Sequence, residues 1–253
     1  MFYWKKDNQI LTFLTLMLTL LLTGCSESGD PLPEITPSTS INKIMPLGAS
    51  RVEGARPVYE SFRYELWKQL VAGGWDFDYI GTMKDDASYP DFQDLSFDAD
   101  HEGRGGWTSG QILEGIGGWL SATGAPDIVL FSSPAGNDAL QGLDYDQAVE
   151  HINAIIDVLQ SANANVTIII EQLAPGQSEI MTGTLAQYFE RIQEDLPALA
   201  QSQTTATSRV MVVDMFTGFT DDLLADEVHY NEAGARFVAD RYYAVLEEVL
   251  VVE

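Results

Sequence analysis

The segment Lys43-Ile-Met-Pro-Leu-Gly-Ala-Ser50 sets the fold, because a short apolar run ends there in a small-residue turn that carries a hydroxyl. Such a run, bounded by glycine, is typical of a buried β-strand. Strand-like runs recur at 77–80, 127–131, 166–170 and 210–213. Amphipathic stretches with helical spacing alternate with them, at 59–72, 108–121, 146–161, 184–196 and from 231 onward.

This alternation predicts an α/β fold, because strands joined through helices form a mostly parallel sheet whose two faces the helices cover. We therefore expect a three-layer α/β/α sandwich around a five-stranded sheet. Gly73 and Pro197 predict the ends of two helices. Thr108 or Ser109 is expected to cap a third helix and Asn231 to cap the last.

The N-terminus has the pattern of an export signal. Lys5 and Lys6 precede an uncharged, largely apolar run over 10–22, which is too short to span a bilayer comfortably. The sequence Leu22-Thr-Gly-Cys25 then resembles a bacterial lipoprotein box, which implies that residues 1–24 are removed and that Cys25 is lipidated. An ordinary cleaved signal peptide is the alternative. Cys25 is the only cysteine, so no intramolecular disulfide can form.

Residues 25–41 are rich in Ser, Pro and Thr and predict a flexible tether between the lipidated cysteine and a domain over 42–253. Several acyl chains on one cysteine would anchor the protein stably in the cell envelope. Ser26, which follows the cysteine in place of an acidic residue, favours the outer membrane if the source is Gram-negative.

The charge balance limits the partners of the protein. The 253 residues include 13 basic and 38 acidic ones, a formal net charge of −25. Such a charge repels nucleic acid and anionic lipid surfaces, so we expect no nucleic-acid partner and membrane contact through the N-terminal lipid only. The oligomeric state does not follow from the sequence.

Three residues supply the hydroxyl, imidazole and carboxylate that an activated serine nucleophile requires. Ser50 follows the first strand, and Asp226 and His229 precede the last helix. A histidine can take the proton from a serine, while a carboxylate holds that histidine in the correct tautomer. The carboxyl ends of parallel strands share one edge of the sheet, so the fold allows these residues to meet. The predicted chemistry is ester hydrolysis, without a metal or another cofactor.

Four short blocks, in order, resemble the SGNH hydrolases, also called the GDSL family. They are Gly48-Ala-Ser50, His101-Glu-Gly-Arg-Gly-Gly-Trp107, Ala135-Gly-Asn-Asp138 and Asp226-x-x-His229. The resemblance implies a flavodoxin-like fold, with Ser50 as nucleophile, His229 as base and Asp226 as its orienting partner. The backbone N–H groups of Ser50 and Gly106 and the side-chain amide of Asn137 would form the oxyanion hole.

Two positions depart from the family pattern. Ala49 stands where the family has aspartate, which leaves the bracing of the nucleophile loop unexplained, and Ala135 stands where it has glycine. Gly136 is expected to keep the second turn open. A non-catalytic relative that binds glycans in the old active-site groove is the alternative that Ala49 leaves open.

The remaining candidates have simpler interpretations. His151 lies inside a predicted helix and is expected at the surface or its boundary. His101 lies among carboxylates, but one histidine with scattered acids is weak support for a metal site, so we expect this segment to shape the Gly106 loop. Trp107 is a candidate for stacking on a sugar ring, with packing as the alternative.

The ester class follows from resemblance alone. His101-Glu-Gly-x-x-Gly-Trp107 resembles the branch that includes acetylxylan and related carbohydrate esterases. This implies a short acyl group, acetate above all, on a carbohydrate. A lysophospholipase- or arylesterase-like lipid esterase is the alternative enzyme, although no long apolar lid is evident.

Overall fold

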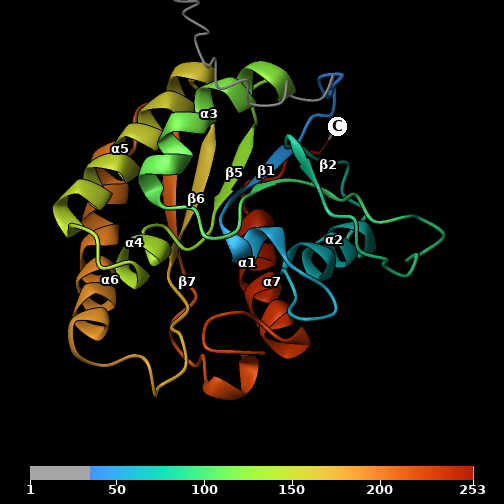
Figure 1. Cartoon of the computed structure of the whole chain (residues 1–253). Coiled ribbons are helices and arrows are strands. Elements are labelled where there is room, and N and C mark those ends of the chain that lie inside the picture. Colours follow the sequence, from blue (N-terminus) through green and yellow to red (C-terminus); the bar gives the residue numbers. More distant parts are fainter. Residues whose placement is uncertain (1–34, 253) are drawn as a thin grey trace, which may run out of the picture. The chain divides into compact units, whose positions relative to one another are not determined.

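The centre of the fold is a mostly parallel sheet flanked by helices (Figure 1). The structure, a computed structural model, describes residues 35–252. Within these residues the sheet has seven strands, in the order β3-β4-β1-β5-β6-β7, with β2 paired to β1. Only the β3–β4 pair is antiparallel. The strands are β1 (Lys43–Gly48), β2 (Asp78–Tyr79), β3 (Met83–Lys84), β4 (Asp100–Gly103), β5 (Ile128–Phe131), β6 (Thr167–Gln172) and β7 (Arg209–Asp214).

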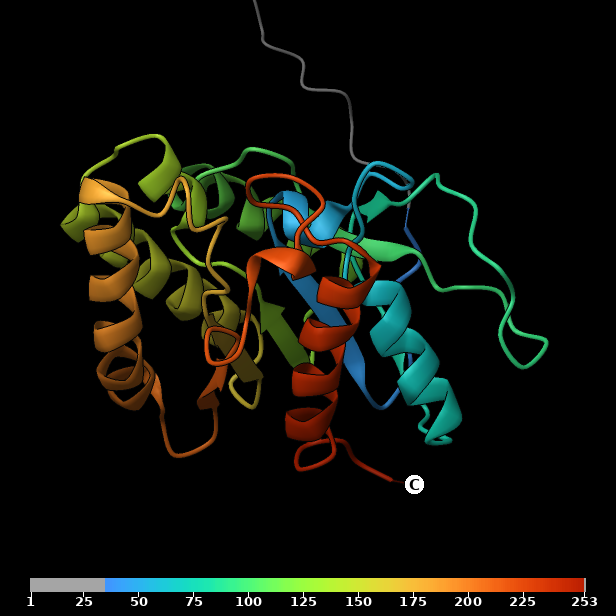
Figure 2. The ribbon, with the colours of Figure 1, turned by 90° about the horizontal axis from the view of Figure 1, so that it is seen from below.

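Helices cover both faces of this sheet, as predicted. Figure 2 shows α6 on one side of the strands and α2 with α7 on the other. The elements are α1 (Ser50–Glu53), α2 (Arg63–Ala72), α3 (Ser109–Thr123), α4 (Gly136–Leu140), α5 (Tyr145–Ala162), α6 (Gly183–Gln203), the 3₁₀ turn η1 (Asp221–Leu223) and α7 (Glu232–Leu246).

Residues of the strands β1, β5, β6 and β7 pack into two separate cores, one on each face of the sheet. Met45 and Leu47 of β1 contact the core formed with α3, α5 and α6, whereas Ile44 belongs to the core under α2 and α7. All residues of β5 are buried, which explains its continuous apolar sequence. The three-layer α/β/α architecture is therefore confirmed.

The prediction of five strands was too low. β3 and β4 lie within the segment that the sequence suggests is a loop, because β4 reads Asp-His-Glu-Gly and has no apolar run. The side chain of Glu102 in β4 is nevertheless fully buried. Glu102 accepts hydrogen bonds from the Thr82 N–H at 2.8 Å and from Arg104 Nη2 at 2.6 Å. These partners satisfy a buried charge that would otherwise exclude this sequence from the sheet.

Helix α6 continues past Pro197, where the sequence predicts its end. Proline has no N–H to donate to the carbonyl four residues earlier, which here belongs to Gln193. The side chain of Gln172 supplies the missing donor, since its Nε2 lies 2.9 Å from the Gln193 oxygen. A distant side chain on β6 thus makes the proline tolerable inside the helix.

The predicted caps of α3 and α7 are confirmed. Thr108 Oγ1 accepts from the Gln111 N–H, and Asn231 Oδ1 accepts from the Gly234 N–H at 3.0 Å. The helix expected from Tyr59 begins only at Arg63, because Glu60 instead donates its N–H to the Tyr230 carbonyl at 2.8 Å. This bridge brings the Tyr59 segment alongside the residues around position 229.

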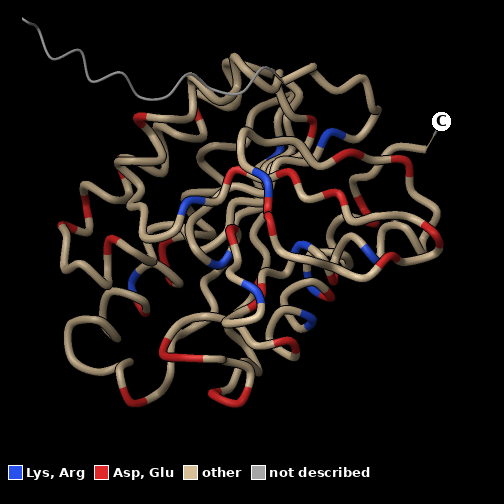
Figure 3. Tube along the Cα trace, turned by 45° about the vertical axis from the view of Figure 1, so that its right-hand side comes forward, with Lys and Arg blue, Asp and Glu red and all other residues tan. Residues whose placement is uncertain are grey.

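Acidic residues are spread along much of the described trace, with fewer basic ones between them (Figure 3). None of the helices described is both long and apolar enough to cross a membrane. Cys25, with the predicted signal peptide and lipidation, lies outside the described residues.

Candidate active site

Ser50 begins α1 directly after β1, at the carboxyl edge of the sheet. The turn requires glycine at position 48, because a Cβ there would lie 2.8 Å from Val52 Cγ2 and 2.9 Å from the Ser132 carbonyl oxygen. The carbonyl of Ala49 accepts the N–H groups of Val52 and Glu53. This short helical turn holds the serine hydroxyl at the end of the strand.

Ser50, His229 and Asp226 form one chain of hydrogen bonds. His229 Nε2 lies 2.9 Å from Ser50 Oγ, and His229 Nδ1 lies 2.8 Å from Asp226 Oδ2. A carboxylate only accepts, so Nδ1 carries the proton and Nε2 presents its lone pair to the serine hydroxyl. The histidine therefore stands between the other two residues, as a general base must.

Local contacts fix the acid and the base. Asp226 Oδ1 also accepts the N–H groups of Val228 and His229, at 2.9 and 2.8 Å. Partial burial raises the pKa of Asp226, but these donated hydrogen bonds together outweigh it and leave the pKa below its ordinary value. The ring of Tyr59 stacks on that of His229, with centroids 3.9 Å apart. Asp226 is thus ionised, and stacking on Tyr59 fixes the orientation of the His229 imidazole beside it.

Two hydrogen bonds join α4 and its C-cap, next to the predicted oxyanion residue Asn137, to the segment that carries Gly106. Asn137 Nδ2 donates to the Trp107 carbonyl at 2.8 Å, and Gln141 Nε2 donates to the Gly106 carbonyl at 3.1 Å. Gly106 has φ +77°, a left-handed conformation that favours glycine, and a Cβ there would meet no atom within 4 Å. Asn137 and Ser50 line one cavity. The second N–H of the Asn137 amide remains available for a substrate oxygen.

The turn before Asn137 differs from its expected form. Gly136 was expected to keep the turn open, but it is Ala135 that adopts the left-handed conformation, with φ 60° and ψ 9°. Ser133 is also left-handed, with φ 47°. A non-glycine residue in this region costs about 1–2 kcal/mol. The strained turn aims α4, and with it Asn137, at the nucleophile.

A small apolar cavity of about 40 Å³ opens beside Ser50. Leu140, Leu173 and Phe189 form its apolar wall. Phe189 also borders a larger cavity of about 420 Å³ that includes Phe216. One buried ring therefore stands between a small space at the nucleophile and a much larger one.

A third cavity, of about 400 Å³, adjoins the other end of α1. It is lined by Glu53, by the Tyr59 ring that stacks on His229, and by charged residues that include Lys84 and Asp85. Ser50 thus lines the small apolar cavity, and the larger polar cavity begins at the other end of α1.

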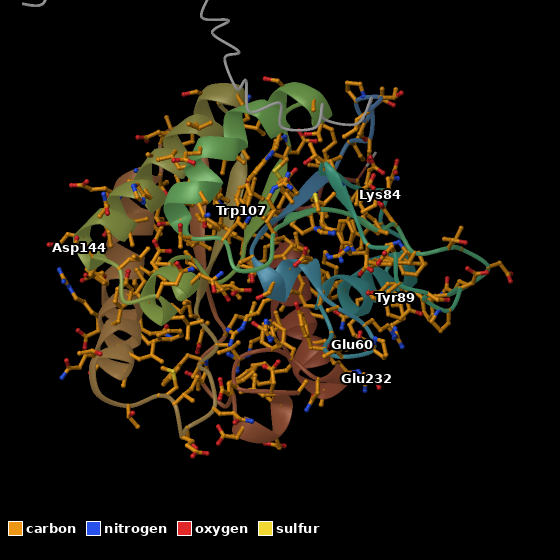
Figure 4. All side chains as sticks on the ribbon, viewed as in Figure 1. Glu60, Lys84, Tyr89, Trp107, Asp144 and Glu232 are labelled. Atoms are coloured by element: carbon orange, nitrogen blue, oxygen red, sulfur yellow. The ribbon has the colours of Figure 1, made fainter. Side chains whose placement is uncertain are left out.

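Trp107 and His101 have packing contacts. The Trp107 ring lies 5.7 Å from that of Trp119 and under the Arg104 guanidinium, beside the start of α3 (Figure 4). His101 is buried in β4, and its Nδ1 accepts the Gly103 N–H at 2.9 Å. Burial, with Arg63 and Arg104 nearby, lowers the pKa of His101 to about 2. The segment shapes the loop leading to Gly106, and stacking of a sugar on Trp107 stays a prediction.

No group of three or more His, Cys, Asp and Glu side chains within residues 35–252 has the arrangement of a metal site. The polar residues His101, Glu102 and Asp98 are occupied by backbone and arginine partners instead.

A second cluster of serine, aspartate and histidine lies at the start of α3. Ser109 Oγ is 2.7 Å from Asp138 Oδ1 and 3.2 Å from His151 Nδ1, while the Ser109 N–H donates to Asp138 Oδ2 at 2.8 Å. Here the serine stands in the middle, and its hydroxyl donates a hydrogen bond to the carboxylate. The histidine can only donate to that hydroxyl, so this cluster does not activate a nucleophile.

Sequence reasoning identified Ser50, Asp226 and His229 but not Tyr59, Phe189 or the second cluster. Tyr59 reads as a residue of a helix, and Phe189 as one of many apolar residues on another. No local pattern marks either as a neighbour of Ser50.

Comparison with known proteins gives the family context. The model of the GDSL-like Lipase/Acylhydrolase family matches residues 70–237, a range that includes Asn137, Asp226 and His229 and begins after Ser50. No curated protein sequence matches the chain significantly.

Solved structures match most of the chain. An acetyl esterase mutant crystallised with acetate ion and a carbohydrate esterase family 3 protein from Talaromyces cellulolyticus each share 29% identity and a TM-score of 0.71, covering 83% of this chain and 98% of theirs. A family 3 carbohydrate esterase from Clostridium thermocellum shares 28% identity and a TM-score of 0.67, covering 82% of this chain and 96% of its own.

Proposed function

The chain belongs to the GDSL-like lipase/acylhydrolase family, and on that premise we propose that it is a serine esterase that removes acetyl groups from carbohydrates. The observation that carries the proposal is the hydrogen-bonded chain Ser50–His229–Asp226. The family and the esterase structures support hydrolysis of an ester, and the proposed acyl and alcohol specificities rest on the small cavity at Ser50 and the polar cavity at Glu53 and Tyr59.

In the proposed reaction, Ser50 Oγ bonds to the ester carbonyl carbon as His229 Nε2 takes the hydroxyl proton. The resulting oxyanion accepts hydrogen bonds from the Ser50 and Gly106 N–H groups and from Asn137 Nδ2, each worth about 3–4 kcal/mol of barrier. His229 then protonates the leaving alcohol. Water, deprotonated by the same histidine, cleaves the acyl-enzyme and releases the acid.

The small cavity supports a short acyl group. A single water needs about 10–15 Å³ of such space, so 40 Å³ accommodates about three atoms of that size. An acetyl group has three non-hydrogen atoms. Phe189 and Leu173 close the space beyond it, which disfavours a long acyl chain.

The larger polar cavity supports a carbohydrate as the alcohol. Tyr59 offers an aromatic edge, and Glu53, Lys84 and Asp86 offer hydrogen-bonding groups to hydroxyls. The related structures described as carbohydrate esterases agree with this assignment. A lipid alcohol would find few apolar partners among these charged side chains.

A panel of substrates tests the proposal. We expect kcat/KM to fall from p-nitrophenyl acetate through butyrate to octanoate, and acetylated xylo-oligosaccharides to release acetate. A rate that rises with chain length would favour the lipid esterase. Glycan binding without hydrolysis of any ester, in a protein whose Ser50→Ala variant behaves identically, would favour the non-catalytic alternative.

We also propose that residues 42–253 form the enzyme domain, and that Cys25 anchors it to the cell envelope through a tether over 25–41. The support is the lipoprotein-like sequence before Cys25. Metabolic labelling with a radioactive fatty acid should mark the wild type and not Cys25→Ala, and the variant should leave the membrane fraction. Unlabelled wild-type protein would favour an ordinary cleaved signal peptide.

A further inference from the structure

The residue after the nucleophile has an unusual set of contacts. Arg51 is only 8% exposed and donates to three backbone carbonyls. Its Nε lies 2.8 Å from the Val228 oxygen, Nη1 lies 2.7 Å from the Ala174 oxygen, and Nη2 lies 2.9 Å from the Pro175 oxygen. The guanidinium therefore joins α1 to the loop after β6 and to the turn that carries His229.

Through these contacts Arg51 binds the residues that precede and follow His229 in the sequence. Val228 precedes His229, and Tyr230 follows it with its ring 4.8 Å from the Arg51 guanidinium carbon. Tyr230 is fully buried, so the ring offers a firm apolar face to the cation. Since Arg51 adjoins Ser50 in the chain, one side chain is attached to both partners of the Ser50–His229 hydrogen bond.

The charge of Arg51 has no direct carboxylate partner within residues 35–252. Ser133 mediates the nearest contact, because its Oγ lies 3.4 Å from Arg51 Nη1 while its N–H donates to Glu171 Oε2 at 2.7 Å. Glu171 is fully buried and also accepts from Tyr242 at 2.7 Å. A buried cation satisfied mainly by carbonyls holds their positions through the fixed fork of its donors.

We propose that Arg51 is a positioning residue that sets the distance between Ser50 Oγ and His229 Nε2 by binding the carbonyl of Val228. Ala49 contributes only backbone contacts to this turn, so Arg51 provides the side-chain brace of the nucleophile loop. The inference rests on the proposed function, because the distance that it sets matters only if Ser50 is the nucleophile.

The first test compares Arg51→Lys and Arg51→Ala with the wild type. A lysine ammonium cannot reach three divergent carbonyls as a planar fork does. We expect kcat to fall about 10- to 100-fold in both variants, because a misplacement of about 1 Å has an effect of that size, with KM changed less than twofold. Guanidinium ion should restore part of the activity of Arg51→Ala and none of that of Ser50→Ala.

Arg241→Ala is the matched control, since Arg241 also donates to backbone carbonyls, those of Asp214 and Thr217, without contacting the His229 turn. Its kcat should equal that of the wild type. A kcat within twofold of wild type in a folded Arg51→Lys or Arg51→Ala protein would overturn the proposal, as would an equal loss in Arg241→Ala. If Arg51→Ala does not fold, Arg51→Lys decides.

Hydrogen exchange of the amides over 226–231 gives a measurement independent of activity. We expect faster exchange there in Arg51→Lys than in the wild type, and unchanged exchange in Arg241→Ala. Unchanged exchange in Arg51→Lys would contradict the brace itself. A wild type without esterase activity, in contrast, would contradict the proposed function and leave the exchange result to test the brace.

Discussion

The two clusters of serine, aspartate and histidine contain the same residue types and differ in the order of their hydrogen bonds. In the first, His229 stands between Ser50 and Asp226. In the second, Ser109 stands between Asp138 and His151. A histidine in the middle can accept the serine proton, whereas a serine in the middle donates its only O–H hydrogen bond to the carboxylate and leaves none for the histidine to accept. The order of the hydrogen bonds, and not the types of residue, distinguishes the proposed catalytic cluster from the structural one.

The aspartates of the two clusters also differ in their exposure to solvent. The His229 and Asp226 side chains are 20% and 46% exposed, whereas Ser109 and Asp138 are 3% and 2% exposed. The Asp138 carboxylate receives the N–H of the first residue of α3, where the positive end of the helix dipole stabilises it. Since Asp138 adjoins Asn137 on α4, the second cluster fixes the position of the proposed oxyanion residue Asn137 relative to α3.

The largest expected effect compares the two serines. Ser50→Ala removes the nucleophile and should lower kcat about 10⁴- to 10⁶-fold. Ser109→Ala should keep kcat within about tenfold of the wild type and lose about 1.5–3 kcal/mol of stability, because a hydrogen bond to a buried carboxylate is lost. Hydrolysis of p-nitrophenyl acetate and urea denaturation measure both. Equal losses of kcat would contradict the assignment of the two clusters.

The next effect compares the two aspartates. Asp226→Asn should lower kcat about 10²- to 10⁴-fold with the fold intact, because the amide no longer favours the tautomer with a proton on Nδ1. Asp138→Ala should act chiefly on stability, with a cost of about 1–3 kcal/mol for the unpaired donors of Ser109. A thermal scan beside each kinetic measurement separates the two. A larger kcat loss in Asp138→Ala would reverse the roles.

A smaller effect concerns the cavity that opens at the first cluster. Phe189→Ala should join the small space at Ser50 to the larger cavity and raise the octanoate-to-acetate ratio of kcat/KM about tenfold, which corresponds to about 1.4 kcal/mol. Phe216→Ala is the control, because Phe216 is 53% exposed and lines only the larger cavity. An unchanged ratio in a folded Phe189→Ala protein would show that Phe189 does not limit the acyl chain.

The smallest effect is a dependence of stability on pH. The folded-state pKa of Asp226 lies below its ordinary value, so its carboxylate stabilises the fold above the unfolded-state pKa, and this contribution is lost as the pH falls through the folded-state value. The difference in urea midpoint between wild type and Asp226→Asn should be present at pH 6 and diminish as the pH falls below the ordinary aspartate pKa of about 3.9. A difference independent of pH would contradict the ionised state of Asp226.

Several elements were predictable because their signals are local. β1, β5, β6 and β7 are short apolar runs, and Asn231 caps α7 from the adjacent position in the chain. Asp226 and His229 share one turn, so their pairing follows from a spacing of three residues. The carboxyl-edge rule for parallel strands then brings Ser50 to them.

Other elements were not predictable because distant partners decide them. β4 is a strand because Thr82 and Arg104 satisfy Glu102, and α6 continues past Pro197 because Gln172 supplies a donor. Neither partner can be identified from the sequence around the element that it stabilises.

The sequence alone therefore determined the layer architecture and the Asp226–His229 pair, since apolar periodicity and short spacings encode them, and it predicted Ser50 as the nucleophile. Only the tertiary structure decided which histidine stands between a serine and an aspartate, which side chain lies between the small cavity at Ser50 and the larger apolar one, and what braces the turn beside Ala49. Arg51 meets Val228 across 177 positions of sequence. Such contacts depend on how the loops at the sheet edge pack together, and no local pattern records them.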